Sequence, residues 1–503
     1  MKVQFRALAC RPGPRVVPPL VLSLFGLLAA GCGGSGGSGM GTGTTFSGST
    51  TVVVLASSTA NDQLFWFDVT LNSLTLTSES GQTVSLLPSQ VNEEFMHLNG
   101  RVEPLATVSV PQGIYTSATA VVEQAFPACA GLQSSGGLLM DEGLGALHEV
   151  TDVSMEPAQP ITVTGSTMGL VLDLQVSKSA AFSGGCSQSL TGAVTITPTF
   201  TLTPISIAAQ PTNSANGKAL GVEGLIGSVG ANGSGFTANP ISYPPPYSNP
   251  ALTWQVGVNS STTFQGVGSA AGLTAGMPVD MDLAIEPDGS LLASRVAVYD
   301  TDTSDLSVAF GPAEGIYPPY DQSVYPVMWT LEVEQGGQLD VLTSLVGAYG
   351  LNATSQISGQ FANLQSLPFG ATFDSANLVA GQNILFTTHA AEPVDFTPIT
   401  TITLLPQTID GTVSAISNQG NFTTYTVTLA PYDLFPNLAA QPSPQTALLT
   451  NPNTVVVYAD GDTQMLNSSP VGVGGLFRFY GLVFDDNGTL RMDCAQVNDG
   501  VTE

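Results

Sequence analysis

The chain has 503 residues and carries 10 Lys+Arg against 38 Asp+Glu, a formal net charge of −28 at pH 7. A chain this acidic has no basic surface to hold polyanions, so nucleic-acid binding is excluded. Hydrophobic residues make up 43% of the sequence, which is enough to build real cores, and the length favours two to four domains.

Residues 1–31 have the pattern of a secretory signal. A head whose only charges are basic, carried by Lys2, Arg6 and Arg11 among others, precedes an apolar run over 16–30. The run is shorter than the stretch of about 20 apolar residues that a bilayer span needs, and it ends in small residues. We therefore expect this segment to direct export and then to be removed.

The signal ends in "LAAGC" at residues 28–32, which resembles the lipobox of bacterial lipoproteins. The resemblance implies that the Cys32 thiol is acylated with diacylglycerol, that the chain is cut before it, and that the new amine is acylated too. Several acyl chains on one residue give stable membrane attachment. Ala29 stands where leucine is commoner in that family. The other interpretation is an ordinary secreted protein in which Cys32 is incidental.

Residues 32–50 follow as a segment rich in Gly, Ser and Thr, beginning "CGGSGGSGMGTG". This composition is typical of a flexible tether, so we expect a lipid-anchored spacer before the first domain. Gly33 is not the aspartate that retains such lipoproteins in an inner membrane. The resemblance therefore implies the outer membrane of a bacterial cell envelope, on its periplasmic or its surface face.

Beyond the tether the sequence alternates with period two. In "AVTITPTFTLTPISI" (193–207) the apolar residues share one parity while threonines take the other, and "FDVTLNSLTLT" (67–77) and "GLVLDLQV" (169–176) behave in the same way. Such alternation is typical of half-buried strands, and many short strands between Gly, Pro, Asn and Asp indicate sandwiches or barrels. We predict an all-β chain with helix only in the signal segment.

The first predicted domain covers 51–208. Its segments "LFWFDVTLNSLTLTSESGQTVSLL" and "FMHLNGRVEPLATVSVPQGIYTSATAVV" resemble a family of bacterial lipoprotein domains of unknown function. The resemblance implies a transthyretin-like or immunoglobulin-like β-sandwich and no established activity. The family's usual opening, a strand and an Asp-Ala-Pro turn, is replaced here by "VVVLASSTAND".

Two cysteines, Cys129 and Cys186, lie in this predicted sandwich. In the oxidising compartment of an exported protein, two cysteines of one domain usually pair, so we expect a disulfide between them. The alternative is a pair of buried thiols. Cys494 has no obvious partner.

The rest of the chain repeats itself. Residues 276–300 align without a gap on 475–499, and each segment carries a hairpin signal, Asp288-Gly289 or Asn487-Gly488, for which we expect type I′ turns. A more divergent middle copy completes a set over 219–300, 301–407 and 408–503. The repeats resemble a second bacterial family of unknown function, whose members are small five- or six-stranded β-barrels in tandem on exported proteins. We expect the domains to stand as beads in a row.

Aromatic side chains gather in a proline-rich loop of each predicted repeat. The candidate ligand-contact residues are, in chain order, Tyr243, Tyr247, Trp254, Tyr317, Tyr320 and Trp329. Aromatic rings on stiff loops offer large contact area at low entropy cost, which favours a platform for a glycan or a protein partner. The alternative is that the rings pack inward over the small barrels.

Motifs for catalysis are weak. The histidines His97, His148 and His389 stand in no zinc pattern such as H-E-x-x-H, and "DTDTSD" at 300–305 lacks the glycine and glutamate of a calcium loop. No catalytic residue, metal ligand or cofactor is assigned. We expect an envelope protein with a non-catalytic binding or structural role, bound to the membrane by its lipid and to a glycan or an envelope protein. The alternative is a polysaccharide hydrolase or lyase with paired acids between repeats.

Overall fold

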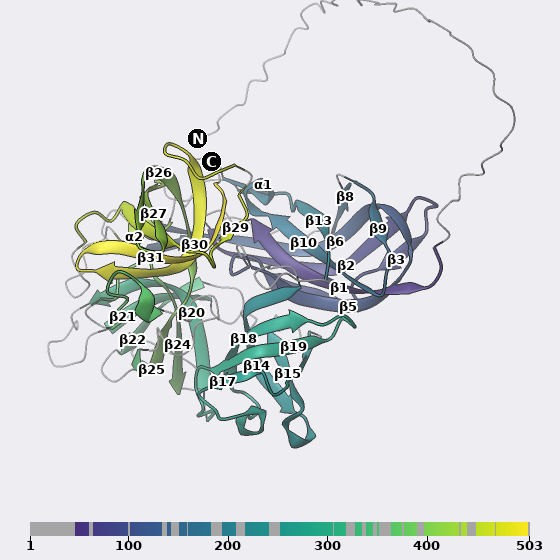
Figure 1. Ribbon diagram of the computed structural model, residues 1–503, viewed down its shortest axis with the longest axis horizontal. Helices are drawn as coiled ribbons and strands as arrows, with labels where there is room; N and C mark the ends of the chain where they lie inside the picture. Colours follow the sequence, from purple (N-terminus) through teal and green to yellow (C-terminus); the bar gives the residue numbers. More distant parts are fainter. Residues whose placement is uncertain are drawn as a thin grey trace, which may run out of the picture. The chain divides into compact units, whose positions relative to one another are not determined.

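The structure is a computed structural model, drawn in Figure 1, and the residues that it describes all fall within 46–500. These residues are 46–59, 64–98, 101–132, 138–141, 150–157, 159–182, 194–207, 217–240, 252–304, 306–317, 327–333, 339–345, 350–351, 364–374, 377–389, 397–431, 434–439, 449–467 and 469–500. The predicted signal segment, Cys32 and the tether as far as residue 45 lie outside them.

The prediction of an all-β fold is confirmed. Regular helix in the described part of the chain is limited to α1 (Val176–Ser179) and α2 (Leu434–Ala439), two short departures from the expectation of helix in the signal segment alone. Single 3-10 turns form η1 (Ala231–Gly233), η2 (Ala270–Gly272) and η4 (Leu364–Ser366). Within the described residues, no helix is long and apolar enough to cross a membrane.

The N-terminal part is a β-sandwich of two main sheets. The four-stranded sheet has the order β13 (Phe200–Ile205), β10 (Thr167–Gln175), β1 (Ser49–Thr59) and β5 (Glu103–Pro111), with β1 and β10 parallel. The other sheet contains β2 (Leu64–Ser78), β3 (Thr83–Ser85), β4 (Val91–Glu94), β6 (Gly113–Leu132), β7 (Leu138–Asp141), β8 (Thr151–Met155) and β9 (Ile161–Val163). A short pair, β11 (Ala180–Phe182) and β12 (Val194–Ile196), stands beside them.

The predicted alternation sets which side chains enter the sandwich core. Phe200 and Leu202 of β13 are buried while the threonines between and after them are exposed. In β2 the buried parity changes between Leu71 and Leu74, because the pairing of β2 with β6 shifts register there. A bulge inserts one unpaired residue and moves the side chains that follow to the other face.

Three further sheets have one common strand order. The first runs β16 (Trp254–Gly257), β15 (Gly235–Pro240), β14 (Lys218–Val229), β18 (Pro278–Ile285), β19 (Leu291–Val298) and β17 (Thr263–Gln265). The second runs β22 (Leu339–Leu345), β21 (Val327–Val333), β20 (Leu306–Tyr317), β24 (Asn383–His389), β25 (Thr397–Leu404) and β23 (Gly350–Leu351). The third runs β28 (Thr454–Ala459), β27 (Phe422–Leu429), β26 (Gln407–Gln419), β30 (Leu476–Asp486), β31 (Thr489–Asp499) and β29 (Gln464–Met465).

Each of these sheets closes into a five-stranded ring with the sixth, shorter strand attached. We number the five ring strands of each barrel in chain order and leave out the short strand, so that β14, β20 and β26 are first strands and β18, β24 and β30 are fourth strands. The ring closes through a parallel pairing between its third and fifth strands, which is β16–β19, β22–β25 or β28–β31. A meander of three strands joined by such a parallel pair is the strand order of the OB-type Greek-key barrel. We call the three rings the first, second and third barrels.

Local details repeat among the barrels. The first strand of each loses register with the second after Ile226, Ala313 or Val413, where one residue is left unpaired. A glycine with positive φ, which is Gly276, Gly381 or Gly474, stands two residues before the fourth strand of each barrel. Glycine adopts this conformation without the steric cost that other residues meet. Shared bulges and turns indicate one structural unit built three times.

The two predicted hairpin turns differ. Asn487 and Gly488 have φ values of 54° and 85° and form a two-residue loop between paired Asp486 and Thr489, as a type I′ turn requires. The expectation of a type I′ turn at Asp288-Gly289 is wrong, because only Gly289 has positive φ there and the loop has a third residue, Pro287.

The first barrel shares a hydrophobic cluster with the sandwich. The cluster contains Leu105 and Val54 of the sandwich together with Trp254, Met281 and other barrel residues. At the β18–β19 hairpin, the Thr167 hydroxyl of β10 donates a hydrogen bond to the Pro287 carbonyl. At this junction the sandwich and the first barrel therefore pack against each other, although the strands of each sheet come from one domain.

Candidate functional site

Most of the residues predicted to contact a ligand or to form a covalent link lie outside the described residues. This holds for Cys32, Cys186, Tyr243, Tyr247 and Tyr320, and for the side chains of Cys129, Tyr317 and Trp329, whose backbones belong to β6, β20 and β21. The predicted Cys129–Cys186 disulfide therefore stays a prediction. Among described cysteines, Cys494 is a free, buried thiol.

Trp254 has a structural role. The side chain lies in the core shared by the sandwich and the first barrel, with 3% of its surface exposed, and its indole Nε1–H donates to the Pro104 carbonyl at 2.8 Å. Its candidacy as a ligand-contact residue is therefore wrong, because a ligand cannot reach a ring buried in this way. The alternative, inward packing, holds for this ring.

The aromatic-proline loops also occupy different places in the barrels. Those of the first and third barrels lie between the second and third strands, whereas that of the second lies between its first and second strands, β20 and β21. The loops themselves fall largely outside the described residues. Their different positions remove the argument that three equivalent loops form one repeated platform.

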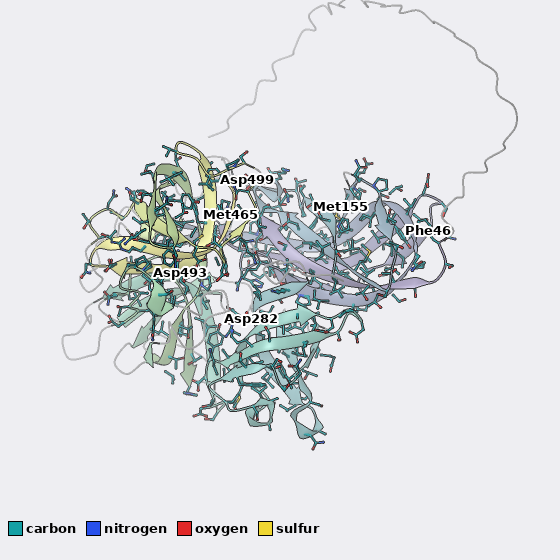
Figure 2. The ribbon with its side chains drawn as sticks, viewed as in Figure 1. Phe46, Met155, Asp282, Met465, Asp493 and Asp499 are labelled. Atoms are coloured by element: carbon teal, nitrogen blue, oxygen red, sulfur yellow. The ribbon has the colours of Figure 1, made fainter. Side chains whose placement is uncertain are left out.

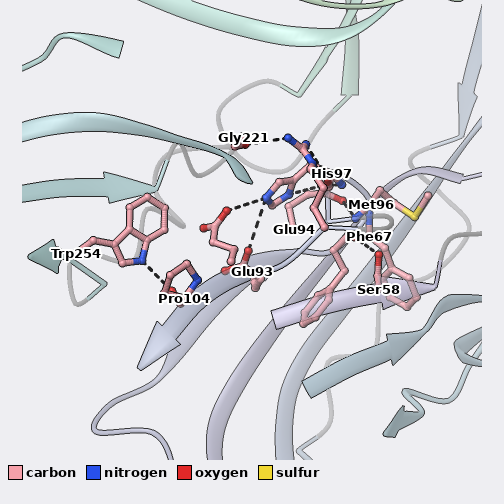
Figure 3. Close-up of polar contacts among 12 residues, drawn as sticks. Ser58, Phe67, Glu93, Glu94, Met96, His97, Pro104, Gly221 and Trp254 are labelled. Carbon is pink, nitrogen blue, oxygen red and sulfur yellow. Dashed lines mark hydrogen bonds and ion pairs between the residues drawn. The ribbon is translucent and has the colours of Figure 1, made fainter. Parts of the chain in front are cut away.

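A compact polar cluster forms where the chain crosses from one sheet of the sandwich to the other. Glu93 and Glu94 end β4 of the larger sheet, a turn carries His97, and Glu103 begins β5 of the smaller one (Figure 3). The turn is anchored by Phe95, whose side chain is fully buried and whose carbonyl accepts a hydrogen bond from the Ser58 hydroxyl at 2.5 Å. The crossover thus brings three carboxylates to one imidazole.

The imidazole of His97 contacts all three carboxylates. Its Nε2 lies 3.2 Å from Glu103 Oε2 and 3.9 Å from Glu93 Oε1, while its Nδ1 lies 3.1 Å from Glu94 Oε2. The three carboxylate side chains are between 3% and 7% exposed, and the imidazole is 22% exposed. Only the histidine of the cluster therefore meets solvent appreciably.

Glu94 is held rigidly by backbone donors. Its Oε1 accepts hydrogen bonds from the N–H groups of Phe67 and Met96, both at 2.8 Å, and its Oε2 accepts from the N–H of His97 at 2.8 Å. A carboxylate held by three backbone donors has little freedom to turn. It therefore orients the His97 ring by accepting the Nδ1–H.

The electrostatics of the cluster keep a proton on the imidazole. Burial opposes the cation, yet the hydrogen bonds to Glu103 and Glu94 outweigh it and raise the pKa of His97 well above its usual value. Burial, and next the charge of Glu103, raises the pKa of Glu93 well above its usual value. Crowded buried carboxylates resist ionising together, because each charge disfavours the next.

Arg101 connects the cluster to the first barrel. Its Nε and Nη2 donate to the His97 carbonyl at 3.2 and 2.8 Å, and its Nη1 donates to the carbonyl of Gly221 in β14 at 2.9 Å. Its guanidinium carbon also lies 5.8 Å from the centroid of the Tyr480 ring in the third barrel. The turn that carries His97 is therefore part of the junction between domains.

Glu93, His97 and Glu103 offer three ligand atoms that all lie within 4.8 Å of one another. Glu103 Oε1 is buried without a hydrogen-bond partner, so the cluster has unused acceptor capacity. These three residues are not recognisable as metal ligands in the sequence, since their side chains come from two strands and a turn. The one local signal is the spacing Glu-Glu-x-x-His at 93–97, which differs from the zinc pattern H-E-x-x-H.

Comparison with known proteins adds little. No family model matches the chain, and no curated protein matches it. Three chains of solved structures do match, among them one described as "drosophila Unr CSD456". That match covers 56% of this chain and 98% of the other at 11% identity, with a TM-score of 0.13. A superposition this poor carries no argument about fold or function.

Proposed function

We propose that this chain is an exported bacterial envelope protein, anchored by lipid on Cys32, with a non-catalytic binding or structural role. The observation that carries the proposal is the order of segments in the sequence. A signal-like run ends at "LAAGC", a Gly/Ser-rich stretch follows at once, and the first strand of the sandwich begins at Ser49. Such an order suits a domain held at a distance from its anchor.

The described acidic clusters support a structural role. Asp280 and Asp282 of β18 both contact Arg295, at 2.8 and 2.9 Å, and the three side chains are less than 10% exposed. The cluster around His97 is likewise enclosed between sheets. Buried, paired charges are poorly placed to meet a substrate. Arg295 joins two strands of the first barrel, β19 and β18, and so fits a structural role.

The alternative, a polysaccharide hydrolase or lyase, needs two carboxyl groups that face each other across an open cleft, about 5–9.5 Å apart. Glu93 and Glu103 are the acidic pair near Trp254, since Glu103 precedes the Pro104 that accepts its indole N–H. Their side chains are only 3% and 4% exposed, and His97 contacts both. A sugar ring has no access to this pair, so the observation favours the binding or structural role.

The anchor is tested by Cys32→Ser in the full chain, expressed in a bacterial host that processes lipoproteins. We expect the variant to leave the membrane fraction and to lose labelling by a palmitate analogue, because the acylated thiol is gone. Cys10→Ser is the matched control and should stay anchored and labelled, since Cys10 lies in the removed segment. Unchanged fractionation of the Cys32→Ser protein would contradict the proposal.

The binding role is tested with the released Cys32→Ser protein on arrays of glycans and peptidoglycan fragments, and by crosslinking in intact cells. The partner expected is a glycan or an envelope protein. Hydrolysis of a glycan on the array, detected as newly formed reducing ends, would support the enzyme instead.

A further inference from the structure

We propose that Glu93, His97 and Glu103 bind a divalent transition-metal ion of the zinc type. The atoms that would bind it are His97 Nε2, Glu93 Oε1 and Glu103 Oε2, with Nε2 at 3.9 and 3.2 Å from the two oxygens (Figure 3). A tetrahedral ion with bonds of about 2.0–2.2 Å holds its ligand atoms roughly 3.3–3.6 Å apart. The side chains therefore need only small rotations to enclose it.

The orientation of His97 also fits a metal ligand. Metal-bound histidines usually donate their second ring N–H to a carboxylate, which fixes the ring and makes the other nitrogen more basic. Glu94 supplies this carboxylate through Oε2, 3.1 Å from Nδ1, and three backbone N–H groups hold it in place. His97 Nε2 is thus directed at Glu93 and Glu103, the two remaining carboxylates.

A second, independent observation comes from Glu103. Its side chain is 4% exposed, and its Oε1 is buried without a hydrogen-bond partner. Leaving a buried carboxylate oxygen unpaired is costly, and buried charges in proteins are paired or coordinate metals. A cation bound at Oε2 of the same carboxylate would offset its buried charge.

The donor set selects the class of ion. One imidazole nitrogen with two carboxylate oxygens suits zinc and neighbouring transition metals, whereas calcium and magnesium prefer oxygen ligands alone. Binding forms one N–metal and two O–metal bonds. Each ligand atom binds in its deprotonated form and gives any proton it carries to solvent, and the two carboxylates balance the charge of the divalent ion.

The position of the site gives the ion a structural role that goes beyond the proposed function. The ion would join β4 of one sheet to β5 of the other through the turn between them. Arg101 ties that same turn to the first barrel through the Gly221 carbonyl. Occupancy would therefore stabilise both the closure of the sandwich and its junction with the first barrel.

The test uses the full-length protein, stripped with a chelator and titrated with Zn²⁺ by calorimetry, then with Co²⁺ by visible absorption. We expect one Zn²⁺ per chain, proton release on binding, a rise in Tm and the intense absorption of a low-coordinate Co²⁺ site. Glu93→Gln and Glu103→Gln should each lose this site. Glu94→Gln should weaken it about 10–100-fold, because it removes only the carboxylate that orients His97.

Glu123→Gln is the matched control, since Glu123 is an exposed carboxyl of the same sandwich, on β6. It should bind Zn²⁺ like the parent protein. Thermal unfolding of each variant in the presence of chelator shows whether the metal-free protein folds. If a variant does not fold, the Co²⁺ spectrum of the parent protein tests whether the site exists. No Zn²⁺ binding by the parent, a Co²⁺ spectrum identical to that of the free aqueous ion, or unchanged binding in folded Glu93→Gln and Glu103→Gln would overturn the proposal. None of these outcomes depends on the lipid at Cys32.

Discussion

The indole N–H of Trp254 donates a hydrogen bond to the carbonyl of Pro104 at 2.8 Å, and the tryptophan comes from the first barrel while the proline belongs to the sandwich. Trp254 is 3% exposed and lies in the hydrophobic cluster common to both domains. Pro104 directly follows Glu103, so one short stretch of β5 contributes both to the candidate metal site and to the domain junction.

This contact predicts the effects of two substitutions on stability. Trp254→Phe keeps an aromatic ring but leaves the buried Pro104 carbonyl without its donor, which should cost about 1–3 kcal/mol. Trp254→Ala also removes most of the buried ring and should cost about 3–5 kcal/mol. Denaturant unfolding of both variants measures these losses. A Trp254→Phe protein as stable as the parent would mean that the hydrogen bond contributes nothing.

In the turn before the fourth strand of the third barrel, replacing the glycine by alanine should lower the free energy of unfolding. Gly474 has φ of 86°, and a Cβ added there meets nothing within 4 Å, so Gly474→Ala introduces backbone strain without a clash. We expect a loss of about 1–2 kcal/mol in the free energy of unfolding. Gly461→Ala is the matched control, because its site is equally open and its φ is not positive. Equal stability of the two variants would contradict the role assigned to the positive φ.

Asp493 on β31 predicts a pH-dependent change in stability (Figure 2). Burial, and next the charge of Asp460, raises its pKa from 3.8 to about 7. The folded state therefore holds a proton that the unfolded state has lost, so this group's contribution to stability falls as pH rises from about 4 to about 7. Asp493→Asn should flatten that fall and stabilise the protein by on the order of 1–2 kcal/mol at pH 8, with no effect at pH 3.

Asp499→Asn is the control for this prediction, because Asp499 is an exposed carboxyl on the same strand (Figure 2). The measurement is the free energy of unfolding as a function of pH for the three proteins. An Asp493→Asn profile that runs parallel to that of the parent would contradict the assignment.

The thiol of Cys494 should be protected from reagents in the folded protein. The side chain is 4% exposed, its Sγ donates to the Gln496 carbonyl at 3.3 Å, and burial raises the pKa of the thiol far above its usual value. Alkylating reagents attack the thiolate, so we expect Cys494 to resist iodoacetamide in the folded protein and to react fully after denaturation. Peptide mass mapping measures the modification. Rapid labelling of the folded protein would show that the third barrel opens at this strand.

Several features of the fold are readable from the sequence because they are local. Alternation in 169–176 places Leu170, Leu172 and Leu174 on the buried face, since successive side chains of a strand point to opposite sides. The Asn487-Gly488 pair predicts its own turn, since few residues accept positive φ at two successive positions. Repetition of such strands and turns predicts an all-β chain of sandwiches or barrels, and the resemblance to two families implied a sandwich followed by small barrels.

Other features depend on which segments meet, and the tertiary structure alone decided them. Trp254 stands in an aromatic-rich stretch that reads equally well as a binding loop or as core, and contact with Pro104 places it in the core. Glu93, His97 and Glu103 form one site only because β4 and β5 lie in facing sheets and the turn between them folds back. Alternation along a strand determines which face of the sheet a side chain lies on. The residue that this side chain contacts across the core depends on how the two sheets pack.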